Sequence, residues 1–135
     1  MKNIVLVSII LSLLLMSCDY SDSKLMIKNH SKKTIAIQSN IDTILNSAYL
    51  GKVPYYETIK ITPNDSAYQF LPGKDAWKWE ARNSKNKKLN IFIFDLDTLR
   101  KYNDMEFIRI NKKYKRYEFT EEELNKCNWT IKIRQ

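Results

Sequence analysis

Hydrophobic and polar residues alternate along several short stretches of the chain, which is the spacing of β-strands that bury one face. Strands with this alternation are predicted at residues 24–28, 33–38, 57–62, 77–81 and 129–134. The first two are expected to pair as a hairpin, because Asn29, His30 and Ser31 between them form a turn-like cluster. Residues 89–94 are mostly apolar and predict a central strand. The alternation therefore indicates a chain built mainly from short strands.

Helical signals are brief. Asp97 is expected to cap a turn over residues 98–102, and residues 103–106 have the spacing of a capping box. A second box at residues 120–123 precedes little more than one further turn, and Asn128 suits its C-terminal cap. With many short strands, two glycines and little helix, the chain is predicted to be mostly β. The expected fold is an antiparallel β-sandwich with one to three short helical turns.

The N-terminus has a different pattern. Lys2 is followed by an uncharged apolar stretch, residues 4–16, of about 13 residues. A bilayer core of about 30 Å needs about 20 residues, so this stretch is too short to span it. A basic start, a short apolar core and small residues at its end are typical of a secretory signal. We interpret residues 1–17 as a cleaved signal peptide rather than as a buried helix.

The end of that stretch carries a motif. Residues 15–18 read LMSC, which resembles the lipobox of bacterial lipoproteins, where signal peptidase cleaves before a cysteine that carries a diacylglycerol. The resemblance implies that Cys18 is the lipidated first residue of the mature protein, held in the membrane by its acyl chains. Residues 18–23 would then form a polar tether, and residues 24–135 a single β-rich domain.

The charge balance is basic, with 23 Lys and Arg against 15 Asp and Glu and a net charge of +8. Such a balance is compatible with nucleic acid, anionic lipid or acidic glycan. One run interleaves tyrosines with cations, and its candidate binding residues are Lys112, Lys113, Lys115 and Arg116. Base stacking with phosphate neutralisation would suit single-stranded nucleic acid, whereas a solvated loop is the simpler interpretation. In an envelope protein, anionic glycan or lipid headgroups are expected before nucleic acid.

Asp95 and Asp97 are the candidate catalytic pair. Two positions apart on a strand, they would share a face at about 6–7 Å, and paired carboxylates can act as acid and base in a hydrolase. They also stand at the end of an apolar strand, where aspartate commonly caps the next helix. Capping is the favoured interpretation, and no catalytic residue is assigned.

Other chemistry has little support in the sequence. His30 is the single histidine, and with Cys127 it gives no recognised metal-ligand spacing. There is no serine elbow and no phosphate-binding glycine loop, so neither a metal nor another cofactor is expected. Cys127 itself is expected to be a small buried apolar side chain.

Aromatic residues gather around the loops of the middle third. Exposed aromatic platforms are used in carbohydrate sites, whereas Trp77 and Trp79 at alternating strand positions would more often be core. Burial is therefore the favoured interpretation for the tryptophans. The set comprises Tyr49, Tyr55, Tyr56, Tyr68, Phe70, Trp77 and Trp79.

Three segments of the chain carry a family resemblance. Residues 91–98 (IFIFDLDT), 115–124 (KRYEFTEEEL) and 128–131 (NWTI) resemble a set of small Bacteroidetes lipoproteins with "IFIFD", "RYxLTxxDL" and "NWTI" motifs. Residues 40–43 (NIDT) resemble their "YPDT" segment, with Ile41 in place of the proline. The resemblance implies a single envelope domain and no particular activity.

The same resemblance suggests a location and modifications. Asp19 and Asp22 resemble a diluted acidic export signal, which favours the outer membrane and leaves the facing leaflet open. Thr43, Ser66 and Thr98 follow aspartate and precede an aliphatic residue or alanine, the pattern of O-glycosylation in these bacteria. The expected protein is a lipid-anchored, non-catalytic binding or accessory module with an envelope protein or glycan partner. The alternatives are the aspartate-dependent hydrolase and the binder of anionic glycan or lipid.

Overall fold

A computed structural model describes residues 20–134 of the chain. The predicted signal peptide and Cys18 lie outside the described residues. Within them the fold is mostly antiparallel β with short helices, which confirms the β-rich prediction. The strands are β1 (Ser21–Asp22), β2 (Met26–Asn29), β3 (Ile35–Asn40), β4 (Ser66–Tyr68), β5 (Leu71–Pro72), β6 (Leu89–Asp95), β7 (Lys115–Phe119) and β8 (Thr130–Ile133). The helices are η1 (Ser47–Tyr49), α2 (Val53–Thr58), α3 (Ala76–Asn83), α4 (Leu96–Tyr102), α5 (Met105–Ile110) and α6 (Glu121–Lys126).

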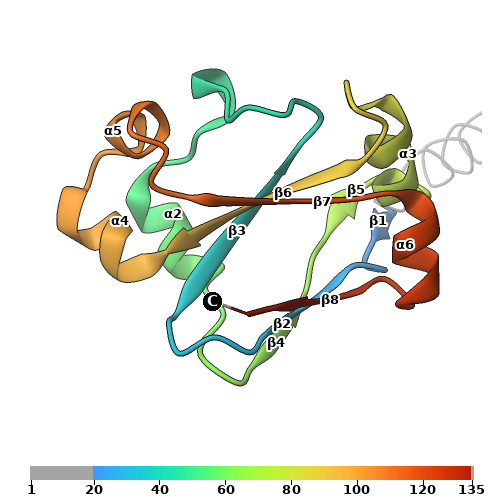
Figure 1. Cartoon of the computed structure of the whole chain (residues 1–135), viewed down its shortest axis with the longest axis horizontal. Coiled ribbons are helices and arrows are strands. Elements are labelled where there is room, and N and C mark those ends of the chain that lie inside the picture. Colours follow the sequence, from blue (N-terminus) through green and yellow to red (C-terminus); the bar gives the residue numbers. More distant parts are fainter. Residues whose placement is uncertain (1–19, 135) are drawn as a thin grey trace, which may run out of the picture.

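The central sheet has the order β3-β6-β7 and is antiparallel throughout. Its middle strand, β6, runs through the centre of the molecule between two groups of helices (Figure 1). Residues 89–94 are all buried, which confirms the predicted central strand. Its side chains alternate between two clusters, with Ile91 and Ile93 in one and Phe92 and Phe94 in the other. A continuous apolar run is what a strand buried on both faces requires.

A second sheet has the order β4-β2-β8. Ile27 of β2 and Ile131 of β8 belong to the same buried cluster as Ile37 and Ile91 of the central sheet, so the two sheets share one core. Helices α3 and α6 close one end of that core (Figure 1). On the other face of the central sheet, α2, α4 and α5 bury the phenylalanines of β6. A small third sheet pairs β1 with β5.

The predicted hairpin between residues 24–28 and 33–38 is wrong. β2 pairs with β4 and, in parallel, with β8, whereas β3 pairs with β6 over six residues. The turn-like cluster forms as expected, but Asn29 and Ser31 hydrogen-bond to each other and to the carbonyl oxygen of Lys33. This network turns the chain from one sheet to the other.

Two predicted strands do not form. Residues 57–62 include the end of α2, after which only Ile61 bridges to Ile35. Residues 77–81 lie in α3, where Trp77 is 3 % exposed and Trp79 is 60 % exposed. Residues two apart point to nearly opposite sides of a helix, so the tryptophans do not share a face. The described residues therefore contain five short α-helices rather than one to three turns.

The helix signals of the C-terminal third are mostly confirmed. The side chain of Thr120 accepts from the Glu123 N–H, and the Glu123 carboxylate accepts from the Thr120 N–H, a full capping box. Asn128 adopts a left-handed conformation after α6. α4 is capped by Asp95, so the prediction that Asp97 is its cap is wrong by two positions. Cys127 is exposed, which also corrects the expectation that it is buried.

Glu80 of α3 is a buried carboxyl group at the end of the core. Burial raises its pKa above the ordinary value, although a hydrogen bond with Ser39 lowers it in part. Among the described residues its Oε1 atom has no hydrogen-bond partner. The folded protein therefore binds a proton here more tightly than the unfolded chain does, and its stability falls as the pH rises through this carboxyl's titration range.

Replacing Glu80 with glutamine is expected to stabilise the protein at pH 7 by about 1 kcal/mol, because no charge is then buried. The gain should vanish near pH 3, below the titration range of an ordinary glutamate carboxyl, because the wild-type group is then protonated in both states. Urea unfolding at both pH values measures it, with Glu122→Gln at an exposed position as the control. A gain of equal size at both pH values would show that charge burial is not its cause.

Candidate binding groove

A groove of about 800 Å³ lies between the edges of the two main sheets. Its walls are the edge strand β3, the segment from η1 to Gly51, the end of α2 with the residues that follow it, and the stretch from β4 to β5. The volume is within the about 300–1,000 Å³ that is usual for ligand sites. Both β3 and β4 are edge strands, so the groove follows the open side of the shared core.

Four aromatic side chains line this groove and are each more than half exposed: Tyr49, Tyr55, Tyr68 and Phe70. They come from η1, from α2 and from the β4–β5 stretch. Monomeric proteins rarely gather exposed apolar side chains in this way outside interaction sites. The aromatic cluster near the loops is therefore a surface feature. The burial expected for the two tryptophans holds for Trp77 and is wrong for Trp79.

A hydrogen-bonded network holds one wall of the groove in place. Tyr56 is fully buried, and its hydroxyl donates to Gln38 Oε1 at 2.6 Å and accepts from the Gly51 N–H at 3.3 Å. Gln38 Nε2 donates in turn to the Tyr49 carbonyl at 3.0 Å. Burial raises the pKa of Tyr56 to about 12, so the hydroxyl keeps its proton. The network joins β3, α2 and η1 and fixes the backbone that carries Tyr49.

Gly51 packs closely against the ring of Tyr55, which leaves no room for a side chain at position 51. A Cβ atom at this position would lie 2.8 Å from the ring of Tyr55. A side chain here would therefore displace an aromatic residue of the groove.

The backbone of β3 is open toward the groove. Ile35 exchanges backbone hydrogen bonds of 3.0 and 2.7 Å with Ile61 on this side of the strand. Because the backbone groups of a strand point alternately to its two sides, those of Ile37 and Ser39 point the same way. Among the described residues, no backbone hydrogen bond meets them there. The chain leaves this edge because residues 53–58 form α2 instead of a strand.

The edge of β4 is open in the same manner. Asn29 donates to the Asp65 carbonyl at 2.9 Å, and Gln69 donates to the Leu25 carbonyl at 2.8 Å. The same alternation directs the backbone groups of Tyr68 away from β2. The sequence patterns did not predict the open edge of β3 or that of β4. Pro54 at the start of α2 was the one local signal that the chain turns away from β3.

Asp95 and Asp97 lie at the start of α4, where Asp95 is the N-cap and Asp97 is in the first turn. Asp95 accepts from the Asp97 N–H at 3.0 Å and pairs with Lys33. Burial raises the pKa of Asp95, but hydrogen bonds from Lys33 and from the Asp97 backbone outweigh it, so the pKa is lowered. Asp97 is exposed and lies 3.4 Å from Arg100. Neither residue lines the groove, and Asp95 has the capping role that was favoured.

The basic run is divided between a turn and β7. Lys113 Nζ lies 5.4 Å from the centre of the Tyr102 ring, and Lys112 adopts a left-handed conformation. Lys115 and Arg116 are successive residues of β7, so their side chains point to opposite faces. The four cations therefore do not form one continuous binding surface.

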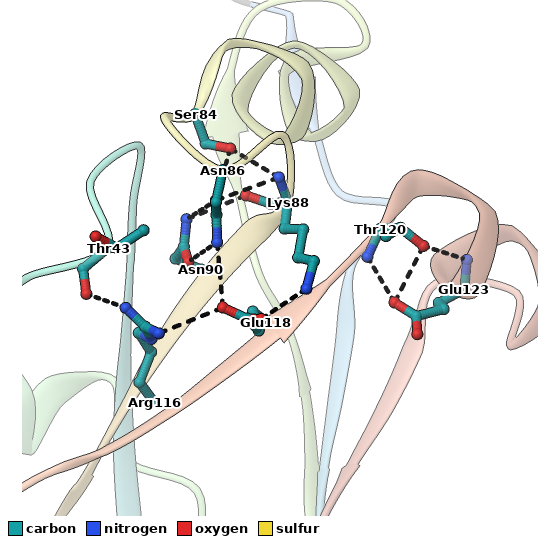
Figure 2. Close-up of polar contacts among 9 residues, drawn as sticks. All are labelled: Thr43, Ser84, Asn86, Lys88, Asn90, Arg116, Glu118, Thr120 and Glu123. Atoms are coloured by element: carbon teal, nitrogen blue, oxygen red, sulfur yellow. Dashed lines mark hydrogen bonds and ion pairs between the residues drawn. The ribbon is translucent and has the colours of Figure 1, made fainter.

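Arg116 is engaged in a polar cluster at the start of β6 (Figure 2). Its guanidinium donates to the Thr43 carbonyl oxygen and lies 3.3 Å from Glu118, which also accepts from Lys88 at 2.6 Å. Beside it the amides of Asn86 and Asn90 exchange two hydrogen bonds of 3.0 Å. These contacts tie β7 to the ends of β3 and α3 and give Arg116 a structural role.

The candidate glycosylation residues lie far apart. Ser66 is exposed at the start of β4, Thr43 is partly buried in the loop after β3, and Thr98 is partly buried in α4. Among residues 20–134, no group of three or more His, Cys, Asp or Glu side chains is placed to hold a metal ion. In the same part of the chain, no helix is both long and apolar enough to cross a membrane.

The groove is therefore the one place in the described part of the chain where a cavity, exposed aromatic side chains and open strand edges occur together. Comparisons of the chain with family models, with curated proteins and with solved structures gave no match.

Proposed function

We propose that this protein is a lipid-anchored, non-catalytic binding module of the bacterial envelope, and that its ligand occupies the groove. The observation that carries the site is the gathering of Tyr49, Tyr55, Tyr68 and Phe70, all more than half exposed, around one cavity. A non-catalytic role is supported by Asp95, whose carboxylate is engaged by Lys33 and by the start of α4. Both sheets pack on one core, which supports a small β-sandwich as the scaffold.

The proposed anchor would hold the domain close to the membrane. The Tyr20 carbonyl accepts from the Gly73 N–H at 2.7 Å. Asp22 is buried, and its backbone carbonyl accepts from Trp77 Nε1 at 2.9 Å. The end of the expected tether is thus part of the folded domain. Tyr20 is two positions after Cys18, a reach of about 7 Å, so a lipid on Cys18 would leave the groove near the bilayer surface.

The groove is tested by photo-crosslinking in intact cells of the source bacterium. A photoreactive benzoyl-phenylalanine at position 70 is expected to give crosslinked species of higher mass, because Phe70 lines the groove. The matched control is the same residue at position 110, since Ile110 is similarly exposed but lies on α5, outside the groove. Equal crosslinking at both positions, or none at position 70, would contradict the proposed site.

A further inference from the structure

We propose that the groove binds an extended peptide segment of a partner protein, which adds a strand to the free edge of β3. This inference rests on the proposed function and names the ligand class for the same site. Ile37 and Ser39 each present an N–H and a C=O toward the groove. They are two residues apart, about 6.8 Å along the strand. An extended chain presents backbone groups at that same spacing, and strand addition to a sheet edge is a general mode of peptide recognition.

The position of the added strand is defined by the neighbouring backbone. Ile61 already occupies the place opposite Ile35, and the chain before it is helical up to Thr58. Within residues 20–134 the place opposite Ile37 and Ser39 is therefore open, and its length suits a segment of three or four residues. The opposite wall carries the exposed ring of Tyr68 in β4.

The polar groups of the groove favour a peptide over a sugar. Sugars are recognised by free side-chain donors and acceptors beside aromatic rings. Here the Gln38 amide is engaged at both ends by Tyr56 and Tyr49. Thr58 Oγ1 donates to the Tyr55 carbonyl, and Gln69 Nε2 donates to the Ala67 carbonyl. The lining also presents the exposed hydroxyls of Tyr49, Tyr55 and Tyr68, but its paired donors and acceptors in register are those of the strand edge, and an extended backbone complements them.

The side chains of the groove define the composition of the peptide. The exposed rings of Tyr55, Tyr68 and Phe70 offer contacts to apolar or aromatic side chains. Lys60 is the single charged residue of the lining. Its partner Glu57 lies 3.6 Å away, but both oxygens of that carboxylate are bound by Arg100 at 2.5 and 2.9 Å. Charge complementarity therefore places an acidic group of the peptide at the Lys60 end.

The probe is a library of fluorescent hexapeptides with blocked ends, in which valine or tyrosine alternates with threonine and one end carries aspartate. Binding to the full-length protein in detergent micelles is measured by fluorescence anisotropy. N-methylation of each amide in turn is expected to weaken binding of the best peptide about tenfold at alternate positions and less than twofold between them, because only every second amide faces β3. If N-methylation weakened binding equally at neighbouring positions, or if no peptide bound, the inference would be overturned.

The role of the β3 edge is tested by comparing two variants. Ser39→Pro removes the backbone N–H at the edge, and Ser39→Ala keeps it. Proline is expected to weaken peptide binding about tenfold and alanine less than twofold. Circular dichroism checks the proline variant; if it does not fold, the N-methyl series decides alone. Oligosaccharide binding that depends on Tyr68 and Phe70, without peptide binding, would overturn strand addition and leave the groove as the site. Self-association lost in Ser39→Pro would identify a second copy as the occupant and also overturn the inference.

Discussion

Replacing Cys18 with alanine is expected to abolish incorporation of an alkyne-labelled palmitate into the protein. The thiol is the proposed site of the diacylglycerol, and alanine has no nucleophile to receive it. Two or three acyl chains on one residue anchor a protein stably, whereas a single chain is marginal.

The control for this experiment is Cys127→Ala. Cys127 is exposed, so it is the thiol that could take up label without a lipobox, and its replacement should leave both labelling and membrane association unchanged. An unprocessed Cys18→Ala chain can stay attached through residues 1–17, so palmitate incorporation is the deciding measurement. Label retained in Cys18→Ala and lost in Cys127→Ala would refute the anchor.

Replacing Asn29 with alanine is expected to lower the free energy of unfolding by about 2–4 kcal/mol. Asn29 is fully buried, and its Nδ2 donates to the carbonyls of Lys33 at 2.7 Å and Ile61 at 2.9 Å. Its Oδ1 accepts from the backbone N–H and the hydroxyl of Ser31. Alanine leaves several buried polar groups with fewer partners, each at a cost of about 1–3 kcal/mol when unsatisfied.

Urea unfolding of the two proteins measures this difference. Asn83→Ala is the matched control, because the Asn83 side chain makes one hydrogen bond to the Trp79 carbonyl at an exposed position. It should cost less than about 1 kcal/mol. The Asn29 amide also holds Ile61, which closes one end of the groove beside Ile35. A cost at Asn29 no larger than at Asn83 would show that the network between the sheets is not needed for stability.

The polar cluster of Figure 2 shows why the charge pattern was a poor guide to the site. A run of cations in sequence becomes a surface only if its side chains share a face. In β7 they alternate, and Arg116 is bound to Thr43 and Glu118. The open edges of β3 and β4 had no signal in composition, because a backbone N–H is the same in every residue except proline.

Local sequence determined the elements whose stability is local. The apolar run of β6 predicts a buried strand by itself, and Thr120 with Glu123 predicts the start of α6, because a capping box needs only residues three apart. The alternation at Thr130–Ile133 likewise predicts β8. In these segments every contact that selects the structure is made within the segment or follows from burying its apolar side.

Tertiary structure decided the pairing of the strands and the site. β3 pairs with β6 rather than with its sequence neighbour β2, because the side chains on its two faces then join the same two buried clusters as those of β6. Residues 77–81 form a helix that takes Trp77 and Ala81 into the core and leaves Trp79 exposed, whereas a strand would place all three on one face. The groove exists because α2 draws the chain away from the β3 edge. Such choices depend on contacts between distant segments, which no local pattern contains.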